Sequence, residues 1–191
     1  FVGCDTAVRH DLPVINIISN NNGDPERSPK VVADAQDGWT VVWQQVEPNS
    51  QPLRDFSNVW MVRAPTHDRA WGGRRLVAGN GTDQDKADAP TLAVCSRGAC
   101  SAGGGVVWLA WRQSGSEVKT RVLGAFEPGD GPVRVLGSKS NGVSELRFAT
   151  DGASNTVLLW AVRLPPSDAA PINGVLRAAR SQENAAARCN P

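Results

Sequence analysis

The sequence lacks tyrosine altogether and has only two histidines, His10 and His67, in 191 residues. With so few histidines, catalytic triads that use a histidine base have few ways to be assembled. The longest purely apolar runs are far shorter than the roughly 18 residues that a membrane-spanning helix needs, so no membrane span is expected. The 20 basic and 19 acidic residues nearly cancel. Without a field of one sign, the chain is not expected to bind nucleic acid or an anionic membrane surface.

Motifs for several common chemistries are also missing. No Gly-x-Ser-x-Gly or His-Glu-x-x-His sequence occurs, which removes two frequent hydrolase motifs. The glycines at 103–105 are not followed by Lys-Ser or Lys-Thr, so they predict a turn and not a phosphate cradle. Asp83, Asp85 and Asp88 lie in a segment without the glycine and terminal glutamate of an EF-hand, so a solvated loop is expected there. No metal and no cofactor are therefore predicted.

What is present predicts one all-β domain covering 1–191. A chain of 20.3 kDa with 40% hydrophobic residues can bury a core. Short stretches rich in Val, Leu, Thr and Trp, bounded by Gly, Asp, Asn or Pro, predict β-strands. No helical period persists outside the segment SQENAAAR near the end. The expected fold class is therefore all-β.

The predicted strands fall into three similar units. They begin SPKVVADAQDGWTVVWQQ, APTLAVCSRGACSAGGGVVWLAWRQ and SELRFATDGASNTVLLWAVR. Each unit has a short apolar strand, a turn with Gly, and a second strand carrying what we call a repeated tryptophan: Trp43, Trp111 and Trp160. A further strand carries an arginine: Arg63, Arg121 and Arg177. Self-similarity at this spacing indicates a repeat fold, which divides the chain into units at 28–88, 89–142 and 143–191.

Short strands with one aromatic motif per unit predict β-propeller blades of four antiparallel strands. A β-sandwich is the alternative, and it requires no repeat. The first two units end in a further strand, RRLVAG and VRVLGS, whereas the third has none. Conversely, the apolar segment at 11–20 is a strand without a unit of its own, inside a predicted N-terminal closing segment at 1–27.

Three blades are too few for a ring, because propellers use roughly four to eight. We therefore predict that a second copy of the chain completes a six-bladed ring, with strand 11–20 of each copy joining the third blade of the other. The alternative is a longer precursor whose remaining blades lie on another piece.

The pattern SPKVVADAQDGWTVVWQQ, followed by an arginine-bearing strand, resembles the blades of bacterial sialidase-like (BNR-type) and related lectin propellers. The resemblance spans 28–180 as a degenerate pattern. ADAQDGWT and ATDGASNT keep an Asp and a Gly of the family's Asp-box, and the second unit lacks the box. The resemblance implies a propeller that binds carbohydrate. It does not carry over catalysis, because the family's tyrosine nucleophile has no counterpart in a chain without tyrosine.

The four cysteines suggest an oxidising compartment. Cys95 and Cys100 flank SRGA between the first two strands of the second unit and are expected to bridge that hairpin, since a zinc site would need two more ligands nearby. Cys4 and Cys189, at the two ends, are expected to pair, between chains in the dimer hypothesis. This placement favours a secreted, extracellular or periplasmic protein. A start at Phe1 without a signal-like segment is expected of a processed mature form.

Candidate ligand-binding residues lie mainly in the loop THDRAWGGRR. Trp71 offers an aromatic face for a sugar ring, and the polar side chains beside it could hold hydroxyl or acidic groups. Those neighbours are His67, Asp68 and Arg69. The arginines of the three units are candidates for a surface that binds acidic sugars. The alternatives are that Trp71 covers a blade edge, and that the arginines are structural ion-pair partners. The repeated tryptophans are expected to pack between blades.

Three functions are consistent with these features. The preferred prediction is a secreted, lectin-like propeller that binds a glycan or small polar ligand without turnover. The first alternative is part of a sialidase-like glycoside hydrolase or lyase, which would need paired carboxyl groups. The second is a structural or protein-binding propeller. Folds of this kind host many functions, so the sequence leaves open whether the protein is an enzyme.

Overall fold

The structure is a computed structural model that describes residues 26–33, 38–47, 56–64, 71–79, 85–95, 106–123, 130–137, 142–150, 156–163 and 174–180. These ranges contain β-strands and no α-helix. The first sheet consists of β1 (Glu26–Ala33), β2 (Trp39–Glu47), β3 (Phe56–Ala64) and β4 (Arg75–Ala78). The second consists of β5 (Ala87–Cys95), β6 (Val106–Gln113), β7 (Glu117–Leu123) and β8 (Arg134–Gly137). The third consists of β9 (Val143–Thr150), β10 (Thr156–Arg163) and β11 (Gly174–Arg180).

Each sheet is an antiparallel meander in which every strand pairs with the next strand in sequence. The all-β prediction is therefore confirmed. Each of the three sequence units contains most of one sheet, although β1 and β5 begin two residues before the predicted unit boundaries, at Glu26 and Ala87. Within the described residues the first two sheets have four strands and the third has three, which matches the unit without a final apolar segment. The predicted closing strand at 11–20 lies outside the described residues. No helix among the described residues is long and apolar enough to cross a membrane.

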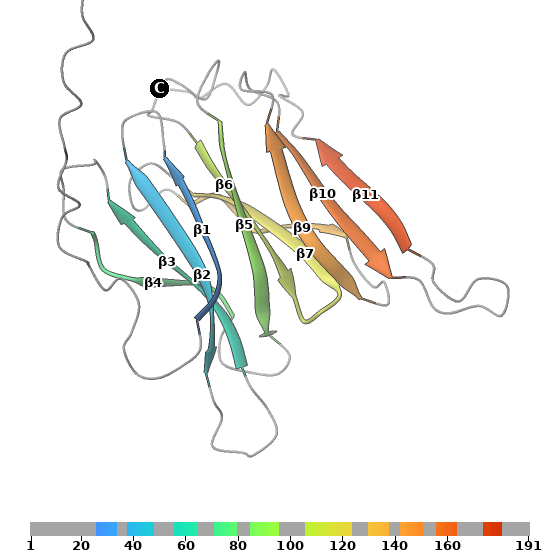
Figure 1. Cartoon of the computed structure of the whole chain (residues 1–191), viewed down its shortest axis with the longest axis horizontal. Helices are drawn as coiled ribbons and strands as arrows, with labels where there is room; N and C mark the ends of the chain where they lie inside the picture. The colour runs from blue at the N-terminus through green and yellow to red at the C-terminus, as the bar shows by residue number, and fades with distance from the viewer. Residues whose placement is uncertain are drawn as a thin grey trace, which may run out of the picture.

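The three sheets follow one another in a row, with the second sheet in the middle (Figure 1). The first strand of the second sheet, β5, lies beside both β1 and β9, which are the first strands of the other two sheets. The first strands are therefore gathered along one side of the molecule. The same order of strands is repeated outwards in each sheet.

A β-bulge recurs in the first strand of every sheet, next to the repeated tryptophan. Ser28, Ala89 and Glu145 have φ angles of 52°, 49° and 42°. The pairing shifts at each of these residues, and the shift lies opposite or directly beside the repeated tryptophan of the neighbouring strand. A positive φ is uncommon for residues other than glycine, so its appearance at three matching positions marks a feature of the repeat. The bulges and tryptophans together define which residues correspond between sheets.

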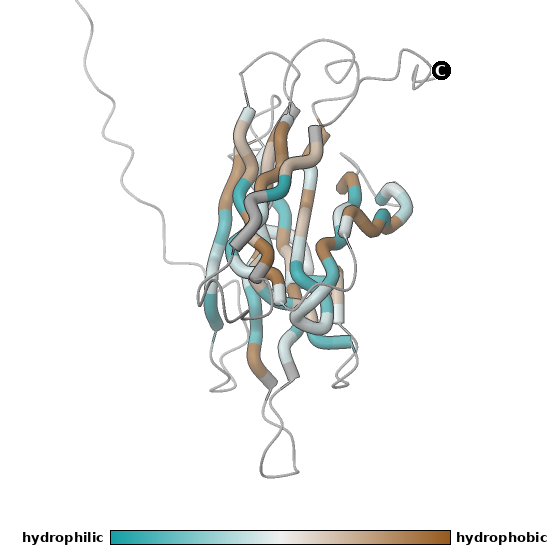
Figure 2. Tube along the Cα trace, turned by 90° about the vertical axis from the view of Figure 1, so that its right-hand side faces the viewer, coloured by the Kyte–Doolittle hydropathy of each residue, from teal (hydrophilic) through white to brown (hydrophobic). Residues whose placement is uncertain are grey.

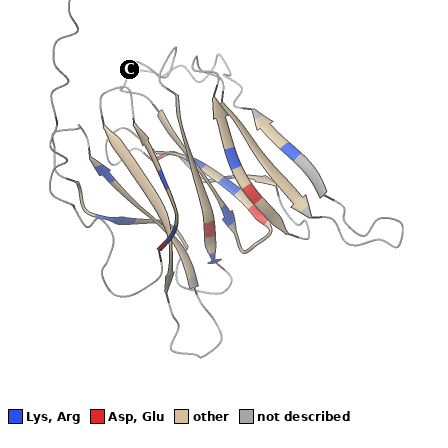
Figure 3. Ribbon diagram, viewed as in Figure 1, with Lys and Arg blue, Asp and Glu red and all other residues tan. Residues whose placement is uncertain are grey.

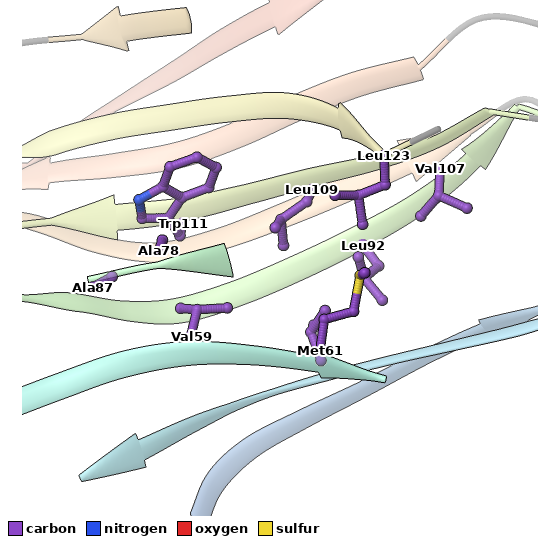
Figure 4. Close-up of a cluster of buried hydrophobic side chains, with 10 residues drawn as sticks. Val59, Met61, Ala78, Ala87, Leu92, Val107, Leu109, Trp111 and Leu123 are labelled. Carbon is purple, nitrogen blue, oxygen red and sulfur yellow. The ribbon is translucent and has the colours of Figure 1, made fainter. Parts of the chain in front are cut away.

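Two apolar layers hold the sheets together. The first lies between the first and second sheets and includes Val59, Met61, Leu109 and Trp111 (Figure 4). The second lies between the second and third sheets and includes Ala110 and Trp160, among others. Hydrophobic stretches alternate with hydrophilic ones along the strands (Figure 2). The prediction that repeated tryptophans pack between units is confirmed for Trp111 and Trp160, each of which faces the preceding sheet.

Trp43 is also buried, but on the other face of its sheet. Its neighbour Val42 belongs to the layer against the second sheet, and successive side chains of a strand point to opposite faces. Trp43 therefore projects away from the second sheet. We call this side the outer face of the first sheet.

Candidate functional site

Part of the predicted ligand loop can be placed. Trp71 is half-buried just before β4, and the backbone N–H of Gly72 donates to the carbonyl of Arg63 at 2.7 Å. In the second sheet the N–H of Gly131 donates to Val122 at 2.8 Å in the same way. Trp71 thus takes the place that Asp130 has in the second sheet. The predicted neighbours His67, Asp68 and Arg69 lie outside the described residues.

The predicted disulfides cannot be followed in the described part of the chain. Cys95 is the last residue of β5. Its expected partner Cys100 lies outside the described residues, as do Cys4 and Cys189. Both bridges, and the location inferred from them, stay predictions.

The three arginines do not occupy corresponding positions, contrary to expectation. Relative to the residue opposite the repeated tryptophan, Arg63 is three positions along its strand, Arg121 is two positions along, and Arg177 is that residue itself. An odd offset places a side chain on the other face of a sheet. Arg63 therefore projects from the face opposite to Trp43. The register does not bring the three side chains to one level, and their role in binding stays a prediction.

Arg121 belongs to an ionic contact between the first and second sheets. Its Nη2 lies 3.5 Å from Oδ2 of Asp130 and 3.3 Å from the carbonyl oxygen of Gly131. Asp130 also accepts two hydrogen bonds from Arg75 of β4, at 2.6 and 2.9 Å. Such bidentate contacts fix geometry as well as charge. Arg121 is thus a structural ion-pair partner, the alternative that the sequence left open.

A different group of side chains comes together on the outer face of the first sheet. Trp43 and Trp60 are directly opposite each other on β2 and β3. The guanidinium carbon of Arg74 lies 4.5 Å from the ring centroid of Trp60, a cation–π contact. Its Nη1 also donates to Oε1 of Gln45 at 3.4 Å. With Asn58, which is opposite Gln45, these residues form what we call the aromatic cluster.

Polar atoms of the aromatic cluster are buried without partners. Trp43 and Asn58 are each only 3% exposed. Within the described residues, five buried side-chain atoms have no hydrogen-bond partner, and three of them are here: Trp43 Nε1, Trp60 Nε1 and Asn58 Oδ1. Leaving a buried donor or acceptor unpaired costs about 1–3 kcal/mol. This concentration therefore marks the cluster as a candidate binding site.

In the second sheet the corresponding tryptophan and glutamine form hydrogen bonds that the first sheet lacks. Trp111 is followed by Gln113 as Trp43 is followed by Gln45. Nε1 of Trp111 donates to Oε1 of Gln113 at 2.9 Å, and Nε2 of Gln113 donates to Asp85 at 3.0 Å. In the first sheet Oε1 of Gln45 accepts from Arg74 instead. The unpaired indole of Trp43 is thus a departure from the pattern of the repeat.

Other features of the described residues are less suited to bind a polar ligand. A shallow pocket of about 290 Å³ lies where β1, β5 and β9 end, and its lining side chains are apolar except for Thr150. Ligand sites need several converging polar groups for orientation. No group of three or more potential metal ligands was found in the described ranges. Basic and acidic residues are interspersed along the strands (Figure 3).

Comparisons with protein-family models, with curated proteins and with solved structures each found no match. The structure itself defines the class: an all-β protein of three repeated antiparallel meanders. Its distinguishing site is the aromatic cluster on the first of them.

Proposed function

We propose that the chain is a secreted, lectin-like binding module that takes a glycan or another small polar ligand at the aromatic cluster. The observation that carries this proposal is the set of unpaired buried atoms beside the stacked Trp60 and Arg74. The indole N–H groups suit the oxygens of a sugar, and the exposed guanidinium of Arg74 suits an acidic group. The resemblance to lectin propellers and the cysteine pattern of the sequence support the same function.

The chemistry of the cluster favours an acidic sugar over a neutral one. Two indole N–H groups and the guanidinium of Arg74 are donors, whereas the unpaired acceptor is Oδ1 of Asn58. A ligand that matches this set must accept more hydrogen bonds than it donates. A carboxylate on a sugar meets this requirement, because guanidinium pairs with carboxylates in bidentate geometry.

Binding without turnover is supported over glycoside hydrolysis. Hydrolases of this type use paired carboxyl groups about 5 to 9 Å apart. The aromatic cluster as defined contains no carboxylate. The well-placed carboxylates of Asp88 and Asp130 are engaged by Arg112 and Arg75 at 2.6 Å.

The proposal includes a propeller-like ring. The three meander sheets, whose first strands neighbour one another, support this part of the proposal, because propeller blades are also antiparallel meanders packed in sequence. Three such sheets would be half of a six-bladed ring, which a second chain would complete. This arrangement requires that each end of the row present a face for another sheet.

Replacing Trp60 or Arg74 with alanine is expected to weaken glycan binding by roughly 10- to 100-fold, the equivalent of one charge-assisted hydrogen bond or stacking contact. The measurement is a glycan array with neutral and acidic sugars, followed by calorimetric titration of the best ligand. Arg74→Lys is expected to recover the charge but not the bidentate geometry, and so only part of the affinity.

Arg134→Ala is the matched control, because Arg134 is an exposed arginine on the outer strand of the second sheet. It is expected to bind as the unaltered protein does. The lectin proposal would be refuted if the unaltered protein bound no glycan on the array. It would also be refuted if the Trp60, Arg74 and Arg134 variants bound with equal affinity.

A further inference from the structure

Part of the outer face of the first sheet is exposed where its counterparts are buried. Val31 is 56% exposed, whereas Leu92, at the same distance from the bulge of the second sheet, is 9% exposed. Trp39 is 40% exposed, whereas Val107, at the same distance from the repeated tryptophan, is fully buried. Val31 and Trp39 therefore form an apolar patch at positions that the repeat normally covers.

The neighbouring sheet explains the burial of the counterparts. Leu92 and Val107 belong to the apolar layer against the first sheet (Figure 4). In the third sheet, Phe148 corresponds to Val31 and packs against the layer shared with the second sheet. These positions are thus covered wherever another sheet precedes. The described neighbour of the first sheet, β5, lies on its other face.

The opposite end of the row shows the complementary half of the interface. Leu159 and Ala178 lie on the face of the third sheet turned away from the second, and they are opposite each other on β10 and β11. Their counterparts in the first sheet are Val42 and Met61, which are fully buried against the second sheet. Leu159 is only half-buried and Ala178 is exposed. This face matches the one that the first sheet offers to the second.

We propose that these two faces are the halves of one interface, and that a second copy of the chain occupies both. The first sheet of each copy packs on the third sheet of the other, so that the contact between consecutive sheets is continued around the ring. The inference rests on the proposed six-bladed ring and names the surfaces that close it.

A second copy fits because one chain offers each half once. Figure 1 shows the first and third sheets at opposite ends of the row, separated by the second. Two copies related by a twofold axis satisfy both ends at the same time and leave no sheet face unpaired. Six sheets fall within the roughly four to eight that propellers use. The aromatic cluster lies on the same outer face, and its Trp43 corresponds to Trp111 and Trp160, which are buried between sheets. In the closed ring the third sheet of the second copy would therefore cover Trp43, which leaves Trp60 and Arg74, on the β3 side, as the part of the cluster open to a ligand.

The test is the native mass by light scattering over a series of protein concentrations. The unaltered chain, of 20.3 kDa, is expected to form a particle of twice that mass. Val31→Asp and Ala178→Asp place a charge in opposite halves of the interface, and each is expected to raise the dimer dissociation constant by roughly 100-fold or more. Val135→Asp is the matched control, since Val135 is 53% exposed on the middle sheet, and it is expected to remain dimeric.

Each outcome separates the hypotheses. Dissociation of the Val31 and Ala178 variants alone, with circular dichroism and melting temperature unchanged, supports the inference. A dimer that tolerates both substitutions refutes these two faces but not the ring. A monomer, or open chains that grow with concentration, refutes the closed ring itself. The native mass is measured without a glycan, so this test can be interpreted even if the lectin proposal fails.

Discussion

Trp111→Ala is expected to lower the free energy of unfolding by about 3–5 kcal/mol, as truncation of a buried large aromatic residue does. Trp111 is 2% exposed and lies in the layer between the first and second sheets with Val59, Met61 and Leu109 (Figure 4). The substitution opens a cavity in that layer. It also leaves Oε1 of Gln113 without the indole N–H that donates to it at 2.9 Å. Because a whole domain is stable by only about 5–15 kcal/mol, this loss is large.

Urea denaturation followed by circular dichroism measures the effect. Trp111→Phe keeps most of the apolar volume and removes the N–H, so its loss is expected to be about 1–2 kcal/mol. Leu76→Ala is the control, because Leu76 is 43% exposed, and a change of less than about 1 kcal/mol is expected there. Equal losses at Trp111 and Leu76 would mean that the sheets do not pack through this layer.

The repeat could be predicted because it depends on residue composition, which is visible in the sequence. Strands can be recognised without knowledge of the fold because they are rich in β-branched and aromatic residues and are bounded by Gly and Asp. The repeated tryptophans are informative because a large aromatic residue that recurs at one position of a central strand is typical of a core. Even the missing final strand of the third unit corresponds to a three-stranded sheet in the described residues.

The register of the strands could not be predicted, and the arginines show why. A shift of one residue moves a side chain to the other face of a sheet, yet it hardly changes the composition of a strand. The residues that set the register here are the bulges at Ser28, Ala89 and Glu145. Glycine is the usual sequence signal for a positive φ, and none of these residues is glycine. Aligning the three units by their arginines therefore predicts matching positions for Arg63 and Arg121, although the two side chains lie on different faces of their sheets.

The aromatic cluster is not predicted by the sequence because its residues are brought together only by the order of the strands. Arg74 and Gln45 are 29 residues apart, and only the order of the first sheet brings them together. One sequence signal did exist, namely the spacing shared by Trp43 and Gln45 with Trp111 and Gln113. That spacing predicts an indole–amide pair in both sheets. The pair forms in the second sheet. In the first sheet Gln45 contacts Arg74 instead, and this difference distinguishes the aromatic cluster from the rest of the repeat.

An ionic contact between Arg112, Asp88 and Val143, which we call the joint, links the second and third sheets. Arg112 donates through Nε and Nη2 to the two carboxylate oxygens of Asp88, at 2.6 and 2.7 Å. Its Nη1 donates to the carbonyl oxygen of Val143, the first residue of β9, at 2.6 Å. One guanidinium thus fixes the bulged strand of its own sheet and the start of the next sheet. Both side chains are mostly buried, being 29% and 21% exposed.

The positive charge of Arg112 is insensitive to pH in the working range. The hydrogen bond from Arg112 to Asp88 raises the pKa of Arg112 above its ordinary value, outweighing the burial that lowers it. A raised pKa means that the charged form of the folded protein is favoured, and the resulting stability is present at any pH below the unfolded pKa. It is lost only as the pH rises through the folded pKa. The stability that depends on the charge of Arg112 is therefore expected to be kept as the pH rises from neutral to moderately alkaline values.

Asp88→Ala is expected to lower the free energy of unfolding by about 2–3 kcal/mol, because it leaves the guanidinium of Arg112 half-buried and without its counter-charge. Arg112→Met is expected to cost a similar amount. The double variant is expected to lose about 1–3 kcal/mol less than the two single losses added together, since either change alone breaks the same contact. The control pair is Glu117 with Lys119, whose charges are 3.4 Å apart, farther than the 2.6 Å of the contact between Arg112 and Asp88. Its coupling is expected to stay below about 1 kcal/mol. Strict additivity of the Asp88 and Arg112 losses would contradict the joint.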